Sequence, residues 1–355
     1  MRAAPAPADA APAGTDAMNP RQRHRLPRSP LALTALGLGS AALAGLYEPV
    51  DAATAHATLA AAWEAGLRYV DTAPFYGYTR SERRVGAFLA DLPRDDVVLS
   101  TKVGRLMRPD GGVLPMTDGW ADPLPFRPLF DYSRDGILRS VEDSLQRLGL
   151  ARIDLLFVHD IGRATHGERH ARHWEALTRG GGFRALEELR ADGRVAAIGL
   201  GVNETEVVRD AMGELRLDCT LLAGRHTLLE QRGLALLDDC ARDGHAIVIG
   251  GPFNSGLLAG QAKYDYAQAP PALLARAQAL REACAAFDVP LEAAALQFPF
   301  GHPAVVSVLS GMRSPAQVRQ NVASFAHVVP AALWDHLRER GLIEADAPCP
   351  PGSAA

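Results

Sequence analysis

Chemically reactive side chains stand at the ends of three consecutive apolar runs in this sequence. Asp71 and Tyr76 follow the run LRYV, and Lys102 follows VVLST. His159 and Asp160 come directly after IDLLFV. Such runs are typical of the buried strands of a parallel sheet, and neighbouring strands lie about 4.8 Å apart. We therefore expect a carboxylate, a phenol, an ammonium group and an imidazole to share one cleft.

These groups are suited to moving a proton alongside a hydride. An unperturbed tyrosine titrates near pH 10, so we expect Lys102 to lower the pKa of Tyr76 by favouring the phenolate. Asp71 would pair with Lys102 and keep it charged, while His159 would donate a hydrogen bond to the substrate oxygen. Each residue alone is more often a structural ion pair or a satisfied core histidine, whereas three successive strand ends favour a shared site.

The apolar runs recur along the chain and alternate with amphipathic helical patterns such as DGILRSVEDSLQRLGL. Eight runs have the length and composition of buried strands: LALTALG, LRYVDTA, VVLSTKV, IDLLFVHD, VAAIGLGVN, CTLLAGR, AIVIGGP and VVSVLSG. Apolar strands separated by helices indicate a parallel sheet covered on both faces. Eight such units predict an α/β fold of the closed (β/α)8 TIM barrel type.

Two segments stand outside this repeat. Residues 104–132, after the third strand, are too rich in Gly and Pro for regular structure, and we expect a long lid or substrate wall there. Its rings Trp120, Phe126 and Tyr132 could pack against a sugar or anchor the loop. Residues 331–343 predict one extra C-terminal helix.

We divide the chain into an Ala/Pro-rich leader (1–24), the barrel (25–345) and a frayed tail (346–355). The composition of the leader predicts disorder. The basic and then apolar stretch that follows its first part also resembles a signal peptide or membrane anchor, yet its glycines equally suit a buried strand that ends in a turn.

Composition narrows the partners and the compartment. The 37 basic and 41 acidic residues give a net charge of −4, which favours a small-molecule substrate over nucleic acid. The four cysteines lack the paired spacing of a zinc site or a disulfide framework, which favours a reducing, cytoplasmic location.

Four motifs closely resemble those of the aldo-keto reductase superfamily: VDTAPFYG, LSTKVGR, DLLFVHD and AIGLGVNE. The catalytic Asp, Tyr, Lys and His of that family fall on Asp71, Tyr76, Lys102 and His159. More narrowly, ALEELRADGRVAAIGLGVNE and the segment around DSLQRLGLARIDLLFVHD look like the D-threo-aldose 1-dehydrogenase or L-fucose dehydrogenase branch. The resemblance implies a (β/α)8 fold, a nicotinamide cofactor, and oxidation of C1 of an aldose of the L-fucose or D-arabinose type to the lactone.

The resemblance also implies the cofactor contacts. SGMRSPAQVRQN looks like the family's adenine-nucleotide segment, in which Gly311, Arg313, Gln317 and Asn321 would surround the adenosine end. Asn203 would bind the carboxamide. A glycine turn before a helix N-terminus offers N–H groups to a phosphate, and Arg313 could clamp a 2′-phosphate.

Two departures from the family pattern bear on the choice between NAD and NADP. Gln317 stands where many relatives have an arginine, and Gly250 stands where many have a tyrosine that stacks on the nicotinamide. Both departures favour NAD slightly over NADP.

Several other functions remain open. The chain could instead be an NADPH-dependent aldehyde or ketone reductase, a pyridoxal dehydrogenase, or a cofactor-binding redox-sensing module of a larger assembly. Lys102 would also suit a Schiff-base aldolase, but Asp71 would hold its amine charged. GLGSAA at 37–42 matches the glycine pattern of a Rossmann fold, without the acidic strand end that should follow it.

A histidine-rich segment raises the question of a metal. His166, His170 and His173 fall on one face of a helical pattern. No carboxylate or cysteine partner is identifiable, so we interpret the segment as a polar surface helix and predict no metal site.

Overall fold

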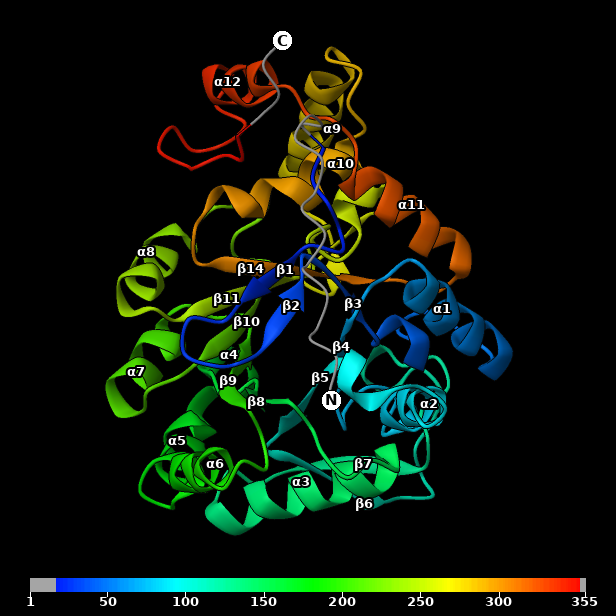
Figure 1. Ribbon diagram of the computed structural model, residues 1–355, viewed down its shortest axis with the longest axis vertical. Helices are drawn as coiled ribbons and strands as arrows, with labels where there is room; N and C mark the ends of the chain where they lie inside the picture. Colours follow the sequence, from blue (N-terminus) through cyan, green and yellow to red (C-terminus); the bar gives the residue numbers. More distant parts are fainter. Residues whose placement is uncertain (1–16, 352–355) are drawn as a thin grey trace, which may run out of the picture.

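Eight parallel strands close into a barrel in the computed structural model, which describes residues 17–351 (Figure 1). In chain order they are β3 (Leu36–Gly39), β4 (Tyr69–Asp71), β5 (Val98–Val103), β8 (Leu155–His159), β9 (Ala197–Val202), β10 (Cys219–Ala223), β11 (Ala246–Gly250) and β14 (Val305–Gly311). β14 pairs with β3 and completes the ring. The predicted (β/α)8 barrel is confirmed, and seven of the predicted runs contain a whole barrel strand, whereas LALTALG, at 31–37, reaches only the first two residues of β3. Because the sheet is closed, the Rossmann interpretation of 37–42 is wrong.

Helices surround the barrel, and most of them turn an apolar face toward it, while the buried residues of the ninth and twelfth belong to a separate apolar cluster (Figure 1). They are α1 (Ala52–Glu64), α2 (Arg80–Leu89), α3 (Arg134–Leu148), α4 (Arg163–His166), α5 (His170–Leu177), α6 (Gly182–Ala191), α7 (Glu206–Glu214), α8 (Leu234–Asp243), α9 (Pro271–Ala285), α10 (Leu291–Gln297), α11 (Pro315–Phe325) and α12 (Ala331–Glu339). Their ends follow local chemistry: the Asp51 carboxylate accepts the Thr54 N–H (2.6 Å) where α1 begins, and Gly149, with φ 65°, ends α3.

A short hairpin covers the amino-terminal end of the barrel. Its strands β1 (Arg23–Arg25) and β2 (Ala32–Thr34) pair antiparallel, and the hydroxyl of Ser29 between them donates to the Ala196 carbonyl just before β9 (2.8 Å). Leu26 is buried against the interior residues of the strands. The predicted domain boundary at residue 25 therefore falls inside this hairpin, and the ordered fold begins earlier than expected. Residues 1–16 of the predicted leader lie outside the described residues.

The insertion at 104–132 contains a two-stranded ribbon. Strands β6 (Arg105–Pro109) and β7 (Phe126–Phe130) pair antiparallel over five residues each, so the expectation of no regular structure is wrong. Proline is tolerated here because each strand of an isolated ribbon has a free edge that needs no N–H donor. A second, smaller hairpin, β12 (Lys263–Tyr264) and β13 (Ala267–Gln268), follows β11.

The C-terminal segment packs against the body of the protein. The predicted extra helix is present as α12, and Arg338 within it donates to the Ala347 carbonyl (3.1 Å). Ala347 is 1% exposed, and a Cβ placed at Gly301 would come within 2.2 Å of the Pro348 carbonyl oxygen. Residues 346–351 are therefore part of the fold, contrary to the expectation of a frayed tail.

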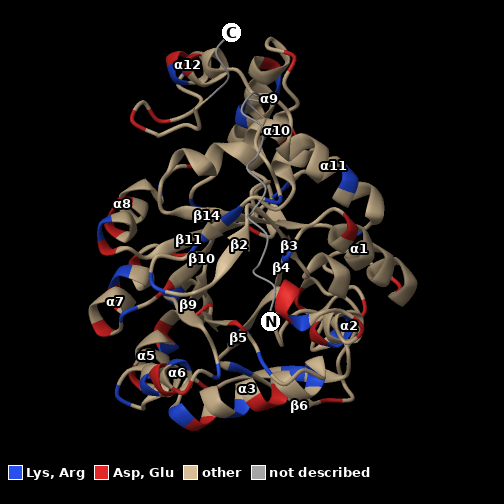
Figure 2. Ribbon diagram, in the orientation of Figure 1, with Lys and Arg blue, Asp and Glu red and all other residues tan. Residues whose placement is uncertain are grey.

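Charged residues of both signs lie on the outer helices (Figure 2). Across residues 17–351, no helix combines the length and the apolar character needed to cross a membrane. The apolar part of the anchor-like stretch is used in β2 and β3.

Candidate active site

A buried ion pair joins the carboxyl ends of β4 and β5. Asp71 and Lys102 are each 1% exposed, and Lys102 Nζ lies 2.5 Å from Asp71 Oδ2. The ammonium group also donates to the Thr72 carbonyl (3.0 Å), while the other carboxylate oxygen accepts the Ser100 hydroxyl (2.7 Å). Burial raises the pKa of Asp71, and Lys102 opposes that rise. All partners of the pair come from two adjacent strands and the residue that directly follows β4, so the barrel itself fixes its geometry.

Tyr76 lies over this pair, in the turn that follows β4. Lys102 Nζ is 4.6 Å from the centroid of the Tyr76 ring, and the ring of Trp120 packs on Tyr76 at 5.8 Å. Burial raises the pKa of Tyr76 well above 10, the charges of Asp71 and Asp160 raise it further, and Arg105 lowers it. The expectation that Lys102 lowers this pKa is therefore not met, because desolvation outweighs the nearby cations and Arg105 is the cation that opposes it.

His159 ends β8 and completes the group. Its ring is nearly perpendicular to that of Tyr76, with centroids 5.9 Å apart. Burial, then the charges of Arg105 and Lys102, lower the pKa of His159 well below 6.5, so the imidazole is neutral at physiological pH. The structure thus brings together all four residues that the sequence predicts for the catalytic group.

A second ion pair, between Arg105 and Asp160, adjoins this group. Arg105 is the first residue of β6, and its guanidinium carbon lies 4.2 Å from the centroid of the Phe75 ring. The sequence places Asp160 at a strand end beside His159, but Arg105 is not predicted as part of the site. The LSTKVGR motif already puts Arg105 three residues after Lys102, and that spacing is the only signal that could have found it.

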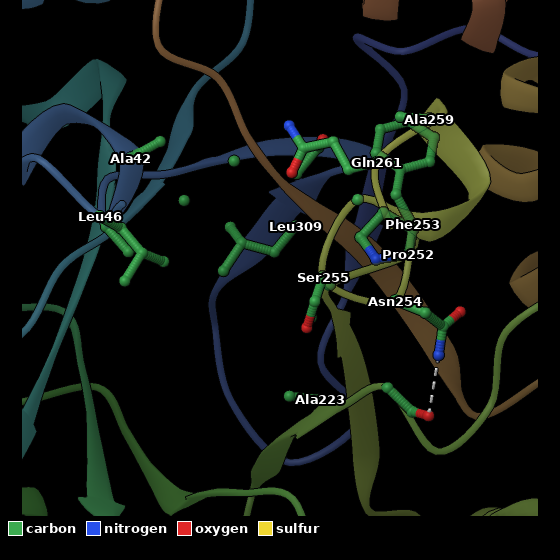
Figure 3. A pocket seen from close by; sticks show the side chains of 18 of the residues that line it. Ala42, Leu46, Ala223, Pro252, Phe253, Asn254, Ser255, Ala259, Gln261 and Leu309 are labelled. Carbon is green, nitrogen blue, oxygen red and sulfur yellow. Dashed lines mark hydrogen bonds between the residues drawn. The ribbon is translucent and has the colours of Figure 1, made fainter. Parts of the chain in front are cut away.

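One cavity of about 360 Å³ joins this group to the predicted cofactor residues. Asp71 and Tyr76 line one part of it. The five predicted cofactor contacts line other parts: Asn203, Gly311, Arg313, Gln317 and Asn321. Figure 3 shows the same cavity with Leu309, Pro252, Phe253 and Gln261 around it.

The lining of the cavity fits a nicotinamide dinucleotide. Gly250 and Gly251 leave space in the cavity for a flat ring. A Cβ placed at Gly250 would have no neighbouring atom closer than 3.6 Å, and a Cβ at Gly251 would have none within 4 Å. At the other end, Ser314 caps α11 and accepts the Gln317 N–H (3.3 Å). The Gln317 side chain accepts the Arg313 backbone N–H (2.9 Å), which holds the loop before the helix in a fixed shape.

The small hairpin β12–β13 contributes a wall that sequence reasoning missed. Asp265 forms a two-pronged pair with Arg225 (3.0 Å for each hydrogen bond), and Lys263 lies 3.3 Å from the centroid of the Tyr47 ring. Tyr266, at the tip of the hairpin, lines the cavity. These contacts tie both sides of the cavity mouth to the hairpin.

The three histidines of 166–173 do not form the predicted polar surface. His166 is 3% and His170 6% exposed, and His166 Nε2 lies 2.9 Å from the Tyr132 hydroxyl. Because the same hydroxyl donates to the His159 carbonyl (2.8 Å), His166 carries its proton on Nε2 and donates to Tyr132. No group of three His, Cys, Asp or Glu residues suited to a metal occurs in the described part of the chain.

A closed (β/α)8 barrel with Asp, Tyr, Lys and His at successive strand ends, beside a cavity that fits a dinucleotide, defines an oxidoreductase of the barrel type. The chain belongs to the Aldo/keto reductase family, whose model matches residues 35–340. The family predicted from the motifs is therefore confirmed, and nicotinamide-dependent oxidation or reduction is its general activity.

Named relatives include two dehydrogenases. The chain is 52% identical to a pyridoxal 4-dehydrogenase of Microbacterium luteolum, over 91% of this chain and 98% of the relative. It is 43% identical to a D-threo-aldose 1-dehydrogenase of a Pseudomonas species, over 88% and 95% of the two chains. Among solved structures, the holo form of an aldo-keto reductase from Bacillus halodurans matches with a TM-score of 0.72 and 25% identity, over 92% and 97% of the chains.

Proposed function

We propose that this enzyme oxidises the hemiacetal carbon of an aldose to a lactone, with NAD as the preferred hydride acceptor. The observation that carries the proposal is the position of Tyr76, between Lys102 and His159 and on the wall of the cavity that also holds the predicted cofactor contacts. The name of the 43% identical relative supports aldose C1 as the reacting carbon.

The nicotinamide ring, when bound, accepts the hydride. Asn203 would hold its carboxamide, and the segment from Gly311 to Asn321 would hold the adenosine end. The Tyr76 hydroxyl, as phenolate, takes the proton from the substrate hydroxyl. His159 is neutral and can donate one N–H to the same oxygen without adding charge. Because the pKa of Tyr76 lies well above 10, the oxidation rate should rise with pH.

The roles of Asp71 and Lys102 follow from their burial. Lys102 lies with its ammonium group 4.6 Å from the centroid of the Tyr76 ring, a cation–π contact that would hold the phenol in place. Asp71 compensates the buried charge of Lys102, and without it the ammonium would lie in a nearly dry site with only a carbonyl as partner.

The pairing of Arg313 supports the preference for NAD. Its guanidinium bonds the Glu48 carboxylate at the edge of the cavity. A carboxylate there repels the 2′-phosphate of NADP and can accept hydrogen bonds from the free ribose hydroxyls of NAD. The four cysteines are all free, which is consistent with our proposal of a cytoplasmic location.

Pyridoxal is a second candidate substrate. The 52% identical relative carries that name, and the rings of Phe75 and Trp120 beside Tyr76 would suit a flat aromatic substrate. Pyridoxal and aldoses share the relevant chemistry, since in each an aldehyde carbon can close onto a hydroxyl of the same molecule to give a cyclic hemiacetal. Loss of hydride from that carbon gives a lactone in both cases.

The test is the initial rate of NADH and NADPH formation with L-fucose, D-arabinose, L-galactose, D-glucose and pyridoxal, with the Tyr76→Phe variant as control. Turnover of one or more aldoses that disappears in the variant supports the proposal. Turnover of pyridoxal alone would make pyridoxal, and not an aldose, the substrate of the enzyme. No turnover of any of the five, while the cofactor still binds, rejects hemiacetal oxidation in favour of an aldehyde reductase or a redox-sensing module.

A further inference from the structure

The Arg105–Asp160 ion pair lies beside the catalytic group without belonging to it. The Arg105 side chain is 6% exposed and the Asp160 side chain 25%, so the guanidinium is sealed in the protein while part of the carboxylate stays accessible. A buried arginine could pair with a carboxylate for structural reasons alone, without any role in substrate binding. The exposed part of Asp160 is what calls for an explanation.

Both residues are held firmly. The Arg105 guanidinium lies between two rings, with its carbon 4.2 Å from the centroid of Phe75 and 5.2 Å from that of Phe130. The Asp160 backbone has φ 44°, a left-handed conformation that costs most residues free energy, and its N–H donates to the Gly201 carbonyl (2.9 Å). The unusual backbone turns the carboxylate toward Arg105 and His159.

The carboxylate keeps one acceptor atom free. Its Oδ2 accepts from Arg105 and lies 3.5 Å from His159 Nε2. Within residues 17–351, Oδ1 accepts no hydrogen bond. Asp160 directly follows His159 in the chain, and its carboxylate lies beside the imidazole that would hold the reacting oxygen.

We propose that Asp160, anchored by Arg105, binds the hydroxyl on the carbon next to the reacting carbon and so selects α-hydroxy hemiacetals, as in aldoses, over substrates that lack this hydroxyl. This inference rests on the proposed function. A carboxylate is a strong acceptor for a sugar hydroxyl, and vicinal hydroxyl oxygens lie about one hydrogen-bond length apart. The oxygen held by His159 and the oxygen held by Asp160 would be such neighbours, because the two side chains are adjacent.

The experiment compares L-fucose with 2-deoxy-L-fucose, or the corresponding pair for whichever aldose reacts fastest, in the full-length enzyme. We expect the wild type to prefer the 2-hydroxy sugar and Asp160→Asn to reduce the ratio of the two kcat/KM values about tenfold, because a charge-assisted hydrogen bond becomes a neutral one. Asp160→Gly, which tolerates the left-handed backbone, should reduce the ratio at least as far. Any change in the pKa of Tyr76 affects both sugars equally and cancels in the ratio.

Asp154→Asn is the matched control, since Asp154 also pairs with an arginine but at the opposite end of β8. It should leave the ratio unchanged. Equilibrium binding of each sugar to NADH-loaded Tyr76→Phe enzyme, with and without Asp160→Asn, gives the same comparison without turnover. The inference is rejected, while the proposed function stands, if Asp160→Asn lowers kcat/KM for both sugars by the same factor. It is also rejected if the wild type does not discriminate between the two sugars. If the wild type turns over no aldose at all, the proposed function fails first and this inference fails with it.

Discussion

Asp154 directly precedes β8 and Asp160 directly follows it, and each carboxylate pairs with an arginine. At the amino-terminal end, Asp154 Oδ2 accepts from Arg94 (2.6 Å) and also from the Leu99 backbone N–H of β5 (2.7 Å). At the carboxyl end, Asp160 accepts from the Arg105 side chain, and none of the backbone N–H groups of residues 17–351 bonds its carboxylate. The same two residue types thus serve opposite ends of one strand in different ways.

The same contrast holds on other strands. Asp218, before β10, accepts the Ile198 backbone N–H of β9 (3.0 Å) and pairs with Arg190 (2.8 Å). Asp71, at the carboxyl end of β4, accepts only from the side chains of Ser100 and Lys102. Carboxylates at the amino-terminal end therefore tie neighbouring strands together, whereas those at the carboxyl end hold other side chains in place. A barrel can in this way separate stability from chemistry along each strand.

The largest effect should come from Tyr76→Phe. The substitution removes only the hydroxyl and keeps the ring contacts with Lys102 and Trp120. We expect kcat to fall about 1,000-fold, because the proton acceptor of the oxidation is lost, while the melting temperature stays unchanged. Initial rates and thermal unfolding on the same preparations test this. Near wild-type rates in the variant would remove Tyr76 from the mechanism. An unfolded variant would show that this residue at the carboxyl end is needed for stability, against the contrast drawn above.

Asp154→Ala should give the opposite result. It removes the carboxylate that pairs with Arg94, whose side chain is largely buried, and the acceptor of the Leu99 N–H, so we expect the free energy of unfolding to fall by about 3 kcal/mol. Activity per folded molecule should remain at the wild-type level. Denaturant unfolding together with kcat below the transition measures both quantities. A large loss of kcat with little loss of stability would contradict the division between the two ends.

The sequence predicts those elements of the fold that can be recognised from their own residues, without knowledge of the segments with which they pair. The barrel strands are largely buried and therefore read as apolar runs, so seven were found whole and β3 in part, and the residues at or just after the ends of these runs include the catalytic group. The ribbon β6–β7 and the strand β1 were missed because their strands are short and partly polar, and β2 was predicted as part of the first barrel strand.

The candidate site shows the same limit. Asp71 and Lys102 are predictable since each stands at the end of its own strand. Arg105 was missed, because its partner Asp160 lies 55 positions further along the chain and only its spacing from Lys102 marks it locally. The pKa of Tyr76 was expected to be lowered but is raised. The sequence indicates which charges lie nearby, but not how completely the phenol is removed from water.

Arg313→Ala should have a smaller effect, confined to the adenosine end of the cavity. We expect KM for NADP to rise about tenfold and KM for NAD to change less, because a guanidinium can bond the 2′-phosphate. Glu48→Gln should do the reverse and improve NADP binding, since it removes the carboxylate that pairs with Arg313. Dissociation constants from the quenching of tryptophan fluorescence test both variants. Equal effects on the two cofactors would mean that Arg313 does not meet the 2′-phosphate.

His226 gives the smallest effect and sharpens the comparison, because it follows a barrel strand at the carboxyl end yet is not part of the cavity. It is fully buried between Phe298 and His302, and neither ring nitrogen has a partner among the described residues. Burial lowers the pKa of His226 to about 3. A histidine with a depressed folded-state pKa stabilises the fold above the unfolded pKa near 6.5, and this contribution is lost as the pH falls from about 6.5 toward 3.

Between pH 7.5 and 5.5 we expect His226 to lower the free energy of unfolding by about 1.4 kcal/mol, because the unfolded chain takes up a proton on this residue and the folded chain does not. His226→Phe keeps an aromatic ring against Phe298 and cannot titrate, so its unfolding free energy should fall less steeply over this pH range by that amount. Denaturant titrations of both proteins at the two pH values provide the comparison. Equal pH dependence in the two proteins would mean that the His226 ring reaches water in the folded state. A position at the carboxyl end can therefore bind a ligand only where its polar atoms remain accessible, as those of Asp160 are in part and those of His226 are not.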